Sequence, residues 1–246
     1  MWVSWMQVRH SRKQRASSMP IAARHARDPL PALSPLPRLE VRRTLDAALM
    51  ASLQQRDVRQ IARRFDSGHR AYVAWYDGTP AAFGWAALNG AEIGELRIRF
   101  EVPVGDVYLW NFVTLNAWRG LGIYPRLIDA IVNAESGEAQ RFWIVYAPEN
   151  HASGSGITKA GFTNLAELSF DRDGRAAVRA LIVGGGTAAS RMLGVPEASG
   201  DLALCWRCVR EGNLESACSG GSCRCDYQRK DRGCASIEQV LHPAGA

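Results

Sequence analysis

The hydrophobic and polar positions of the chain predict alternating strands and helices from residue 39 onwards. Apolar residues recur every three to four positions over 45–53, 58–65 and 125–134, the spacing of amphipathic helices. Runs rich in aromatic and β-branched residues predict strands over 70–76, 81–88, 93–102, 106–114, 141–147, 162–170 and 175–183. Thr44 is a candidate cap for the first helix, and a weaker helix is expected over 150–160. This order of elements indicates a mixed α+β sheet with a strand–helix–strand unit near its middle.

Short turn sequences connect several of these elements. Asp77-Gly78 lies between two strand-like runs and predicts a hairpin, because both residues tolerate a positive φ. The sequence over 171–174 predicts a second hairpin, and the three glycines over 184–186 suggest a hinge after it. Residues 106–114 (DVYLWNFVT) are almost continuously apolar, which favours a central strand covered on both faces.

The first 38 residues are expected to be a disordered, basic, proline-rich leader, since few of their apolar residues recur with any period. A later start at Met19, an organelle transit peptide and a contact with a polyanion are the alternatives. Residues 1–40 hold seven basic and two acidic residues, so this part of the chain carries most of the net charge of +6. The remainder is nearly neutral, and nucleic-acid binding is therefore not expected for the main domain.

The sequence also bears on where the protein is located in the cell. The longest uncharged stretch, Gly78–Ala91, is shorter than the ~20 residues that cross a bilayer, so no membrane span is expected. No apolar signal-peptide core follows the basic residues at the start, which favours a cytoplasmic protein.

A glycine-containing turn follows the predicted central strand and leads into the helix over 125–134. Its sequence is Arg119-Gly120-Leu121-Gly122-Ile123-Tyr124. Glycines let a backbone approach an anion closely, and the N–H groups at the start of a helix point toward it. Taken alone, the turn fits either an anion site or a tight strand–helix connection. It is not a Walker A loop, because no Gly-Lys-Ser/Thr follows.

With its surroundings, this turn resembles the GNAT superfamily of acyl-coenzyme A-dependent N-acyltransferases. The family pattern is Arg/Gln-x-x-Gly-x-Gly/Ala between an apolar strand and a helix. A second family signature, Asn-x-x-Ser followed by Lys-x-Gly-Phe, is matched by Asn150-His151-Ala152-Ser153 and Lys159-Ala160-Gly161-Phe162. The resemblance covers residues 39–183 and implies a central, mostly antiparallel sheet with a splayed parallel strand pair, flanked by helices.

The resemblance also implies a set of site residues for acetyl-coenzyme A (acetyl-CoA). The backbone around the glycine turn would hold the pyrophosphate, and the end of the central strand would pair with the pantetheine arm. The expected cofactor-binding residues are Phe112, Val113, Thr114, Arg119, Gly120, Leu121, Gly122, Ile123, Tyr124, Asn150 and Ser153.

Acetyl transfer to an amine needs a base for the amine and a proton for the departing thiolate. Ile157 stands where many family members have a tyrosine, so Tyr124 or Tyr146 is expected as the acid, unless the thiolate leaves unassisted. Asp106 is the first candidate for the base, with Glu95, Glu149 and His151 as alternatives. Trp85, Trp110 and Trp118 are expected to serve packing rather than the acceptor pocket.

All six cysteines of the chain lie in its last 42 residues, after a linker expected over 184–204. Residues 205–246 are interpreted as a small module in which zinc would supply the folding free energy that a sparse core cannot. Iron–sulfur ligation, redox pairing and incidental thiols in a disordered tail are the alternatives. The candidate ligands are Cys205, Cys208, Cys218, Cys223, Cys225 and Cys234.

The function that these observations favour is transfer of an acetyl or acyl group from acetyl-CoA to a primary amine. The alternative is a non-catalytic acyl-CoA-binding or interaction protein with a metal-stabilised adaptor tail. The partner is then an amine acceptor, either a small molecule or a protein amine, and a homodimer is left open.

Overall fold

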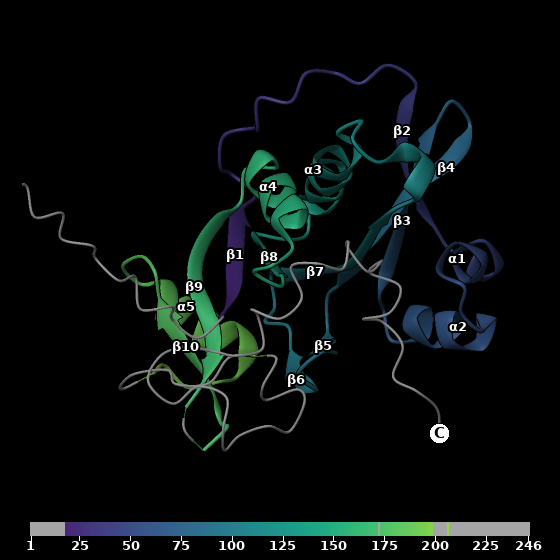
Figure 1. Ribbon diagram of the computed structural model, residues 1–246. Coiled ribbons are helices and arrows are strands. Elements are labelled where there is room, and N and C mark those ends of the chain that lie inside the picture. The colour runs from purple at the N-terminus through teal and green to yellow at the C-terminus, as the bar shows by residue number, and fades with distance from the viewer. Residues whose placement is uncertain (1–17, 172, 199–205, 207–246) are drawn as a thin grey trace, which may run out of the picture.

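The computed structural model describes residues 18–171, 173–198 and 206 (Figure 1). Its main sheet has eight strands in the order β10-β9-β1-β8-β7-β4-β3-β2, and a separate hairpin pairs β5 with β6. The strands are β1 (Met19–His25), β2 (Leu39–Thr44), β3 (Arg70–Tyr76), β4 (Thr79–Ala87), β5 (Gly90–Ile93), β6 (Ile98–Glu101), β7 (Asp106–Thr114), β8 (Arg141–Val145), β9 (Thr163–Phe170) and β10 (Ala176–Ala180). The helices are α1 (Ala47–Gln54), α2 (Val58–Asp66), the 3-10 turn η1 (Asn116–Trp118), α3 (Ile123–Glu135), α4 (His151–Lys159) and α5 (Gly185–Leu193).

Within the main sheet, β7 and β8 run parallel, whereas the other neighbouring strands pair antiparallel. This confirms the predicted mixed fold with a mostly antiparallel sheet and one parallel pair. The turn at Asp77-Gly78 also forms as predicted, with φ values of 52° and 74°. Both residues thus adopt the left-handed conformation that a two-residue hairpin requires.

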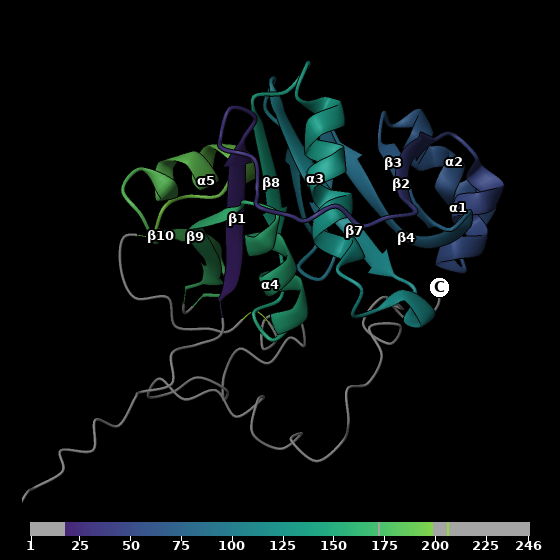
Figure 2. The ribbon, with the colours of Figure 1, turned by 90° about the horizontal axis from the view of Figure 1, so that it is seen from above.

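Helices cover both faces of the sheet (Figure 2). The helices α3 and α4 pack on one face, where Leu127, Ile131 and Ile157 join a core with Leu109 and Phe142 of the strands. The helices α1, α2 and α5 pack on the other face, where the side chains at the alternate strand positions lie. Because successive side chains of a strand point to opposite faces, the continuously apolar β7 can serve both cores at once.

The expected leader over residues 1–38 is wrong for its second half. Residues 19–25 form β1, which lies between β8 and β9 and pairs with both. Ile21 and Ala22 of this strand are completely buried. The segment MPIAARH has two alanines and a proline and so has low intrinsic β-propensity, but burial between two strands overrides that preference. Residues 1–17 lie outside the described part of the chain.

Burial of β1 brings one charged side chain into the interior. Arg24 is 1% exposed, and its guanidinium donates to Asp129 of α3 at 2.7 Å and to the carbonyl of Ala160 at 3.0 Å. A buried guanidinium is tolerated only where charge and hydrogen bonds compensate its lost hydration. Arg24 therefore ties the N-terminal strand to α3 and to the end of α4.

A segment over residues 26–38 then connects β1 to β2, on the far edge of the sheet. It crosses over α3 (Figure 2), where the side chain of Arg126 donates to the carbonyl of Ser34 at 3.0 Å. Leu36 of this segment packs against the core beneath α3. The segment is thus attached to the helix rather than extended away from the domain.

Three further expectations need correction. The single strand expected over 93–102 is a hairpin of β5 and β6, because Gly94 and Arg97 lie in the turn between them and Arg97 has a φ of 55°. The expected hinge and linker contain α5, whose apolar Ala189, Met192 and Leu193 cover the β9–β10 side of the sheet.

The cap of α1 also differs, since Asp46 rather than Thr44 accepts a hydrogen bond from the helix, at Leu49 N. Among the described residues, no helix combines the length and the apolar character needed to cross a bilayer.

Candidate active site

The parallel strands β7 and β8 separate partway along their length. Their register pairs only Asp106 with Arg141, Val107 with Phe142 and Tyr108 with Trp143. Beyond Tyr108, β7 stays paired with β4 as far as Thr114, while β8 stays paired with β1 as far as Val145. The facing edges of the two strands are therefore free of each other over their carboxyl-terminal halves. An extended ligand can pair with such an edge as an additional strand would.

A β-bulge interrupts β7 beside this opening. Trp85 of β4 faces Trp110, but Phe83 faces Val113, so β7 has one extra residue at this point. Asn111 takes up the extra length with a φ of 51°, a left-handed conformation that asparagine tolerates better than most residues. A bulge leaves the extra residue without a partner in the ladder, so its backbone groups can bind a ligand.

The glycine turn follows at the end of β7 and leads into α3. Gly120 and Gly122 have φ values of 82° and 72°, and Gly122 is the residue that precedes α3. Within the described part of the chain, the N–H groups over 120–124 donate to no acceptor outside the helix itself. These donors and the helix dipole make the turn suitable for an anion.

Two arginines add positive charge near the turn. Arg119 donates through Nε to the carbonyl of Thr114 at 3.2 Å, so its side chain bends back toward β7. Arg126, one turn into α3, donates to the carbonyl of Gly122 at 2.7 Å. A Cβ added at Gly122 would lie 2.7 Å from this guanidinium. Arg126 thus stabilises the turn through this hydrogen bond.

The helix α4 completes this end of the site. Its cap, Asn150, accepts a hydrogen bond from Ser153 N at 3.0 Å, and the hydroxyls of Ser153 and Tyr124 lie 3.1 Å apart. Burial raises the pKa of Tyr124 to about 12, with the Ser153 hydrogen bond acting in the opposite direction. Tyr124 also packs edge-on against Phe112 of β7, with ring centroids 5.5 Å apart.

These features agree with a comparison against protein families. A model of the acetyltransferase (GNAT) family matches residues 38–162, about half of the chain. The chain belongs to the GNAT acetyltransferase family. The family model covers the separating strands, the glycine turn and α4.

Solved structures resemble this GNAT acetyltransferase at low sequence identity. A GCN5-related N-acetyltransferase from Kribbella flavida has 16% identity and a TM-score of 0.44, with 61% of this chain and 56% of that chain covered. A protein of the GNAT family from Novosphingobium aromaticivorans has 16% identity and a TM-score of 0.43, with 61% and 60% covered. A predicted acetyltransferase from Clostridium acetobutylicum, solved with acetyl-CoA, has 17% identity and a TM-score of 0.37, with 51% and 90% covered.

This chain therefore spans less than two thirds of the length of the first two proteins. No curated protein matches the sequence.

The structure brings together most of the residues that the sequence singled out in this GNAT domain. Phe112–Thr114, the glycine turn, Tyr124, Asn150 and Ser153 lie at the carboxyl-terminal end of β7 or next to it. Tyr146 follows β8 and contacts α4, because a Cβ on Gly154 would lie 2.9 Å from its ring. Its hydroxyl accepts a hydrogen bond from Asn164 at 3.1 Å.

Asp106 does not lie with the other candidate residues. It begins β7, eight residues before Thr114, which at about 3.3 Å per residue puts it roughly 25 Å from that end of the strand. The indole N–H of Trp143 donates to its carboxylate at 2.8 Å, and burial raises the pKa of Asp106 above its ordinary value. Among the alternatives for the base, Glu149 precedes α4 and His151 begins it, whereas Glu95 lies between β5 and β6.

A cationic side chain that was not predicted from the sequence lies on the α1–α2 face of β7. The guanidinium of Arg64 in α2 lies 5.3 Å from the ring centroid of Trp85 and 4.7 Å from that of Trp110. It donates to Gln54 at 2.7 Å, and the same Gln54 oxygen accepts from Asn111 at the bulge at 2.8 Å. This network links α1 and α2 to the distorted part of β7.

Arg64 makes no ion pair with a carboxylate of the described residues. Burial, aided by Arg56, lowers its pKa to about 10, so it stays charged near neutral pH. The position of Arg64 between Ile61 and Phe65 on the apolar side of α2 was the available signal in the sequence.

The tryptophans pack as expected from the sequence. Trp85 is completely buried, and Trp118 lies against Tyr76 with ring centroids 5.1 Å apart. Trp110 has a second neighbour in His69, whose ring meets it edge-on at 5.2 Å. Burial lowers the pKa of His69, and the charge of Arg64 acts in the same direction.

The predicted metal ligands Cys205, Cys208, Cys218, Cys223, Cys225 and Cys234 all lie outside the described residues. Within 18–171, 173–198 and 206, no group of three or more side chains is arranged to hold a metal ion. The zinc module thus stays a prediction.

Proposed function

We propose that this GNAT acetyltransferase transfers an acetyl group from acetyl-CoA to a primary amine by direct attack on the thioester. The observation that carries the proposal is the separation of β7 from β8. At the end of β7, the glycine turn adds N–H donors that no acceptor among the described residues uses. A phosphate group and an extended arm are the two parts of coenzyme A that such a turn and such an opening fit.

In this proposal the backbone of Leu121, Gly122, Ile123 and Tyr124 binds the pyrophosphate. The pantetheine arm pairs with the free edge of β7 around Phe112–Thr114, and Asn150 and Ser153 of α4 border its other side. Arg126 supports the turn by its hydrogen bond to the carbonyl of Gly122, at 2.7 Å. The thioester then lies toward the bulge at Asn111.

The chemistry follows from the groups around the bulge. A neutral amine attacks the thioester carbonyl carbon, a new C–N bond forms, and the C–S bond breaks as the thiolate leaves. Backbone N–H groups freed by the bulge would stabilise the negative charge that develops on the carbonyl oxygen. The amine loses its proton to a base or to water leading to one, and Glu149 and His151 are the proposed candidates for that base.

Tyr124 is the proposed proton donor for the departing thiolate. Its pKa of about 12 keeps the hydroxyl protonated near neutral pH, and Ile157, 1% exposed in α4, has no proton to give. Tyr124→Phe is expected to lower kcat by about 10-fold to 100-fold and to leave the Kd of acetyl-CoA unchanged, because acid catalysis acts on the chemical step. Steady-state thiol release and calorimetry measure the two quantities.

Tyr76→Phe is the matched control, because Tyr76 lies against Trp118 on the β3 side. A kcat for Tyr124→Phe equal to that of the control would remove Tyr124 from the mechanism. A comparable loss in Tyr146→Phe alone would assign the proton to Tyr146 instead.

The acceptor amine is proposed to approach from the face that carries α1 and α2, because Arg64 and Gln54 link those helices to the bulge. Arg64→Met is expected to raise the KM of the acceptor about tenfold without changing the Kd of acetyl-CoA. The substitution removes the hydrogen bond to Gln54, which also holds Asn111 at the bulge. The control is Arg59→Met, an exposed arginine of the same helix. Equal acceptor KM values in the two variants would contradict this approach direction.

The proposed function is tested by thiol release from acetyl-CoA with a panel of amines. The panel holds polyamines, aminoglycosides, free amino acids, and peptides with a free N-terminus or a lysine. We expect turnover with at least one class, and calorimetric binding of acetyl-CoA without any amine. Binding without turnover across the panel would favour the non-catalytic acyl-CoA-binding alternative, and absence of binding would refute the proposal.

A further inference from the structure

A pocket of about 390 Å³ opens at the amino-terminal ends of β7 and β8, at the opposite end of these strands from the glycine turn. Two of its lining residues, Asp106 and Arg141, are register partners at the start of the parallel pair. The helix α5 and the end of β1 close its other sides. Its polar and charged lining residues are His25, Asp106, Gln140, Arg141, Thr187 and Arg191.

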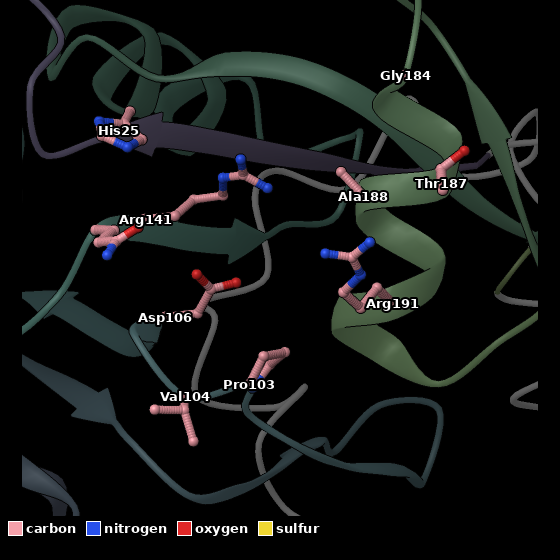
Figure 3. A pocket seen from close by; sticks show the side chains of 10 residues that line it. His25, Pro103, Val104, Asp106, Arg141, Gly184, Thr187, Ala188 and Arg191 are labelled. Carbon is pink, nitrogen blue, oxygen red and sulfur yellow. The ribbon is translucent and has the colours of Figure 1, made fainter.

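Charged groups of both signs converge in this pocket. Figure 3 shows the carboxylate of Asp106 and the guanidinium groups of Arg141 and Arg191 directed toward the same space. Neither arginine forms an ion pair with a carboxylate in the part of the chain that the structure describes. The two positive charges thus face the pocket without a bonded counterion from those residues.

Neighbouring groups hold two of these side chains in place. The indole N–H of Trp143 donates to one carboxylate oxygen of Asp106 at 2.8 Å, which fixes the carboxylate and leaves its other oxygen available. The guanidinium of Arg141 lies over the Trp143 ring, 5.5 Å from its centroid. A stacked guanidinium keeps its N–H edge free for a planar anion such as a carboxylate.

The combination of charges selects the chemistry of a ligand. A simple anion would meet the two arginines but also the negative charge of Asp106, and a simple cation would meet Asp106 but also both arginines. A molecule that carries one carboxylate and one ammonium group satisfies both sets of groups. The volume falls within the range of small-molecule sites.

We propose that this pocket binds a small zwitterionic amino acid, with its carboxylate on Arg141 and Arg191 and its ammonium group on Asp106. The site is separate from the acetyl-CoA opening, because the length of β7 lies between them. It gives Asp106 a role in ligand binding instead of the catalytic role that the sequence suggested. The proposal does not depend on acetyl transfer.

Calorimetry on the full-length protein without acetyl-CoA tests the site. The probes are L-leucine and 4-aminobutanoate, with 4-methylpentanoate and butanoate as counterparts that lack the ammonium group, and inorganic phosphate as a simple anion. We expect at least one amino acid to bind with a millimolar or lower Kd, and its counterpart to bind at least about tenfold more weakly. Phosphate is expected to bind more weakly than that amino acid.

Substitutions of the lining residues test whether the amino acid binds in this pocket. Arg191→Gln is expected to weaken the amino acid about tenfold, whereas Arg175→Gln, which removes an exposed arginine elsewhere, leaves it unchanged. Asp106→Asn keeps an oxygen that can accept from Trp143, and it is expected to make the amino acid and its counterpart bind about equally. Circular dichroism confirms that each variant is folded.

Three results would overturn the proposal. The first is that neither amino acid binds. The second is that a counterpart or phosphate binds to the unmodified protein as tightly as the amino acid or more tightly. The third is that Arg191→Gln or Asp106→Asn leaves binding unchanged, as Arg175→Gln does.

Discussion

Replacing Gly122 with valine is expected to weaken the binding of acetyl-CoA by about 10-fold to 100-fold. Gly122 has a φ of 72°, where a β-branched residue costs on the order of 1–3 kcal/mol, and its added side chain would meet the Arg126 guanidinium. Relief of this strain would shift the backbone N–H groups that we propose to hold the pyrophosphate. Since about 1.4 kcal/mol corresponds to tenfold in Kd, calorimetry with acetyl-CoA should detect the change readily.

Gly78→Val is the matched control for this substitution. Gly78 has a φ of 74° in the β3–β4 hairpin, and an added Cβ would find no atom within 4 Å. It therefore carries similar backbone strain away from the proposed site. An acetyl-CoA Kd that changes equally in the two variants would mean that the glycine turn does not hold the cosubstrate.

Arg24→Met is expected to lower the free energy of unfolding by about 3 kcal/mol. The substitution leaves Asp129 and the carbonyl of Ala160 without the cation that now donates to both, and breaking a buried pair on one side commonly costs 3–5 kcal/mol. Asp129 is 22% exposed and can recover some hydration, which favours the lower end of this range. Equilibrium unfolding in urea measures the difference.

Arg42→Met provides the comparison for an exposed arginine. Arg42 pairs with Glu40 on the edge strand β2, and both side chains are more than half exposed. Such a pair contributes about 0–1 kcal/mol. If Arg24→Met unfolds at the same urea concentration as Arg42→Met, then the interior pair does not anchor β1.

Most of the sheet could be predicted from the sequence because its strands are rich in aromatic and β-branched residues. The predicted range of β7 matches the structure, and those of β3 and α2 differ from it by at most one residue. The strand β1 could not be predicted, because its partners lie more than 100 residues away and its alanines give no local signal. The helix α5 was missed for a related reason, since three glycines at its start suggested a hinge.

The candidate site was predictable where it depends on backbone conformation. Gly120 and Gly122 have the positive φ values that the glycine turn needs, and the sequence pattern requires them there. Side chains that meet only through tertiary structure were harder to predict. Arg64 contacts Gln54 of another helix, which in turn contacts the bulge, and the order of residues does not show that contact. The distance of Asp106 from the glycine turn, in contrast, follows from its place at the start of the predicted strand over 106–114.

The position of β1 bears on how the protein folds as it is synthesised. This strand leaves the ribosome before both of its partners, because β8 begins at residue 141 and β9 at residue 163. At roughly 5–20 residues per second, translation of the intervening chain takes on the order of ten seconds. During that time Met19 and Ile21 belong to an unpaired segment that is open to association with other chains. Slower translation would lengthen this exposure, so the yield of native protein should depend on elongation rate and on chaperones that bind the nascent segment around β1.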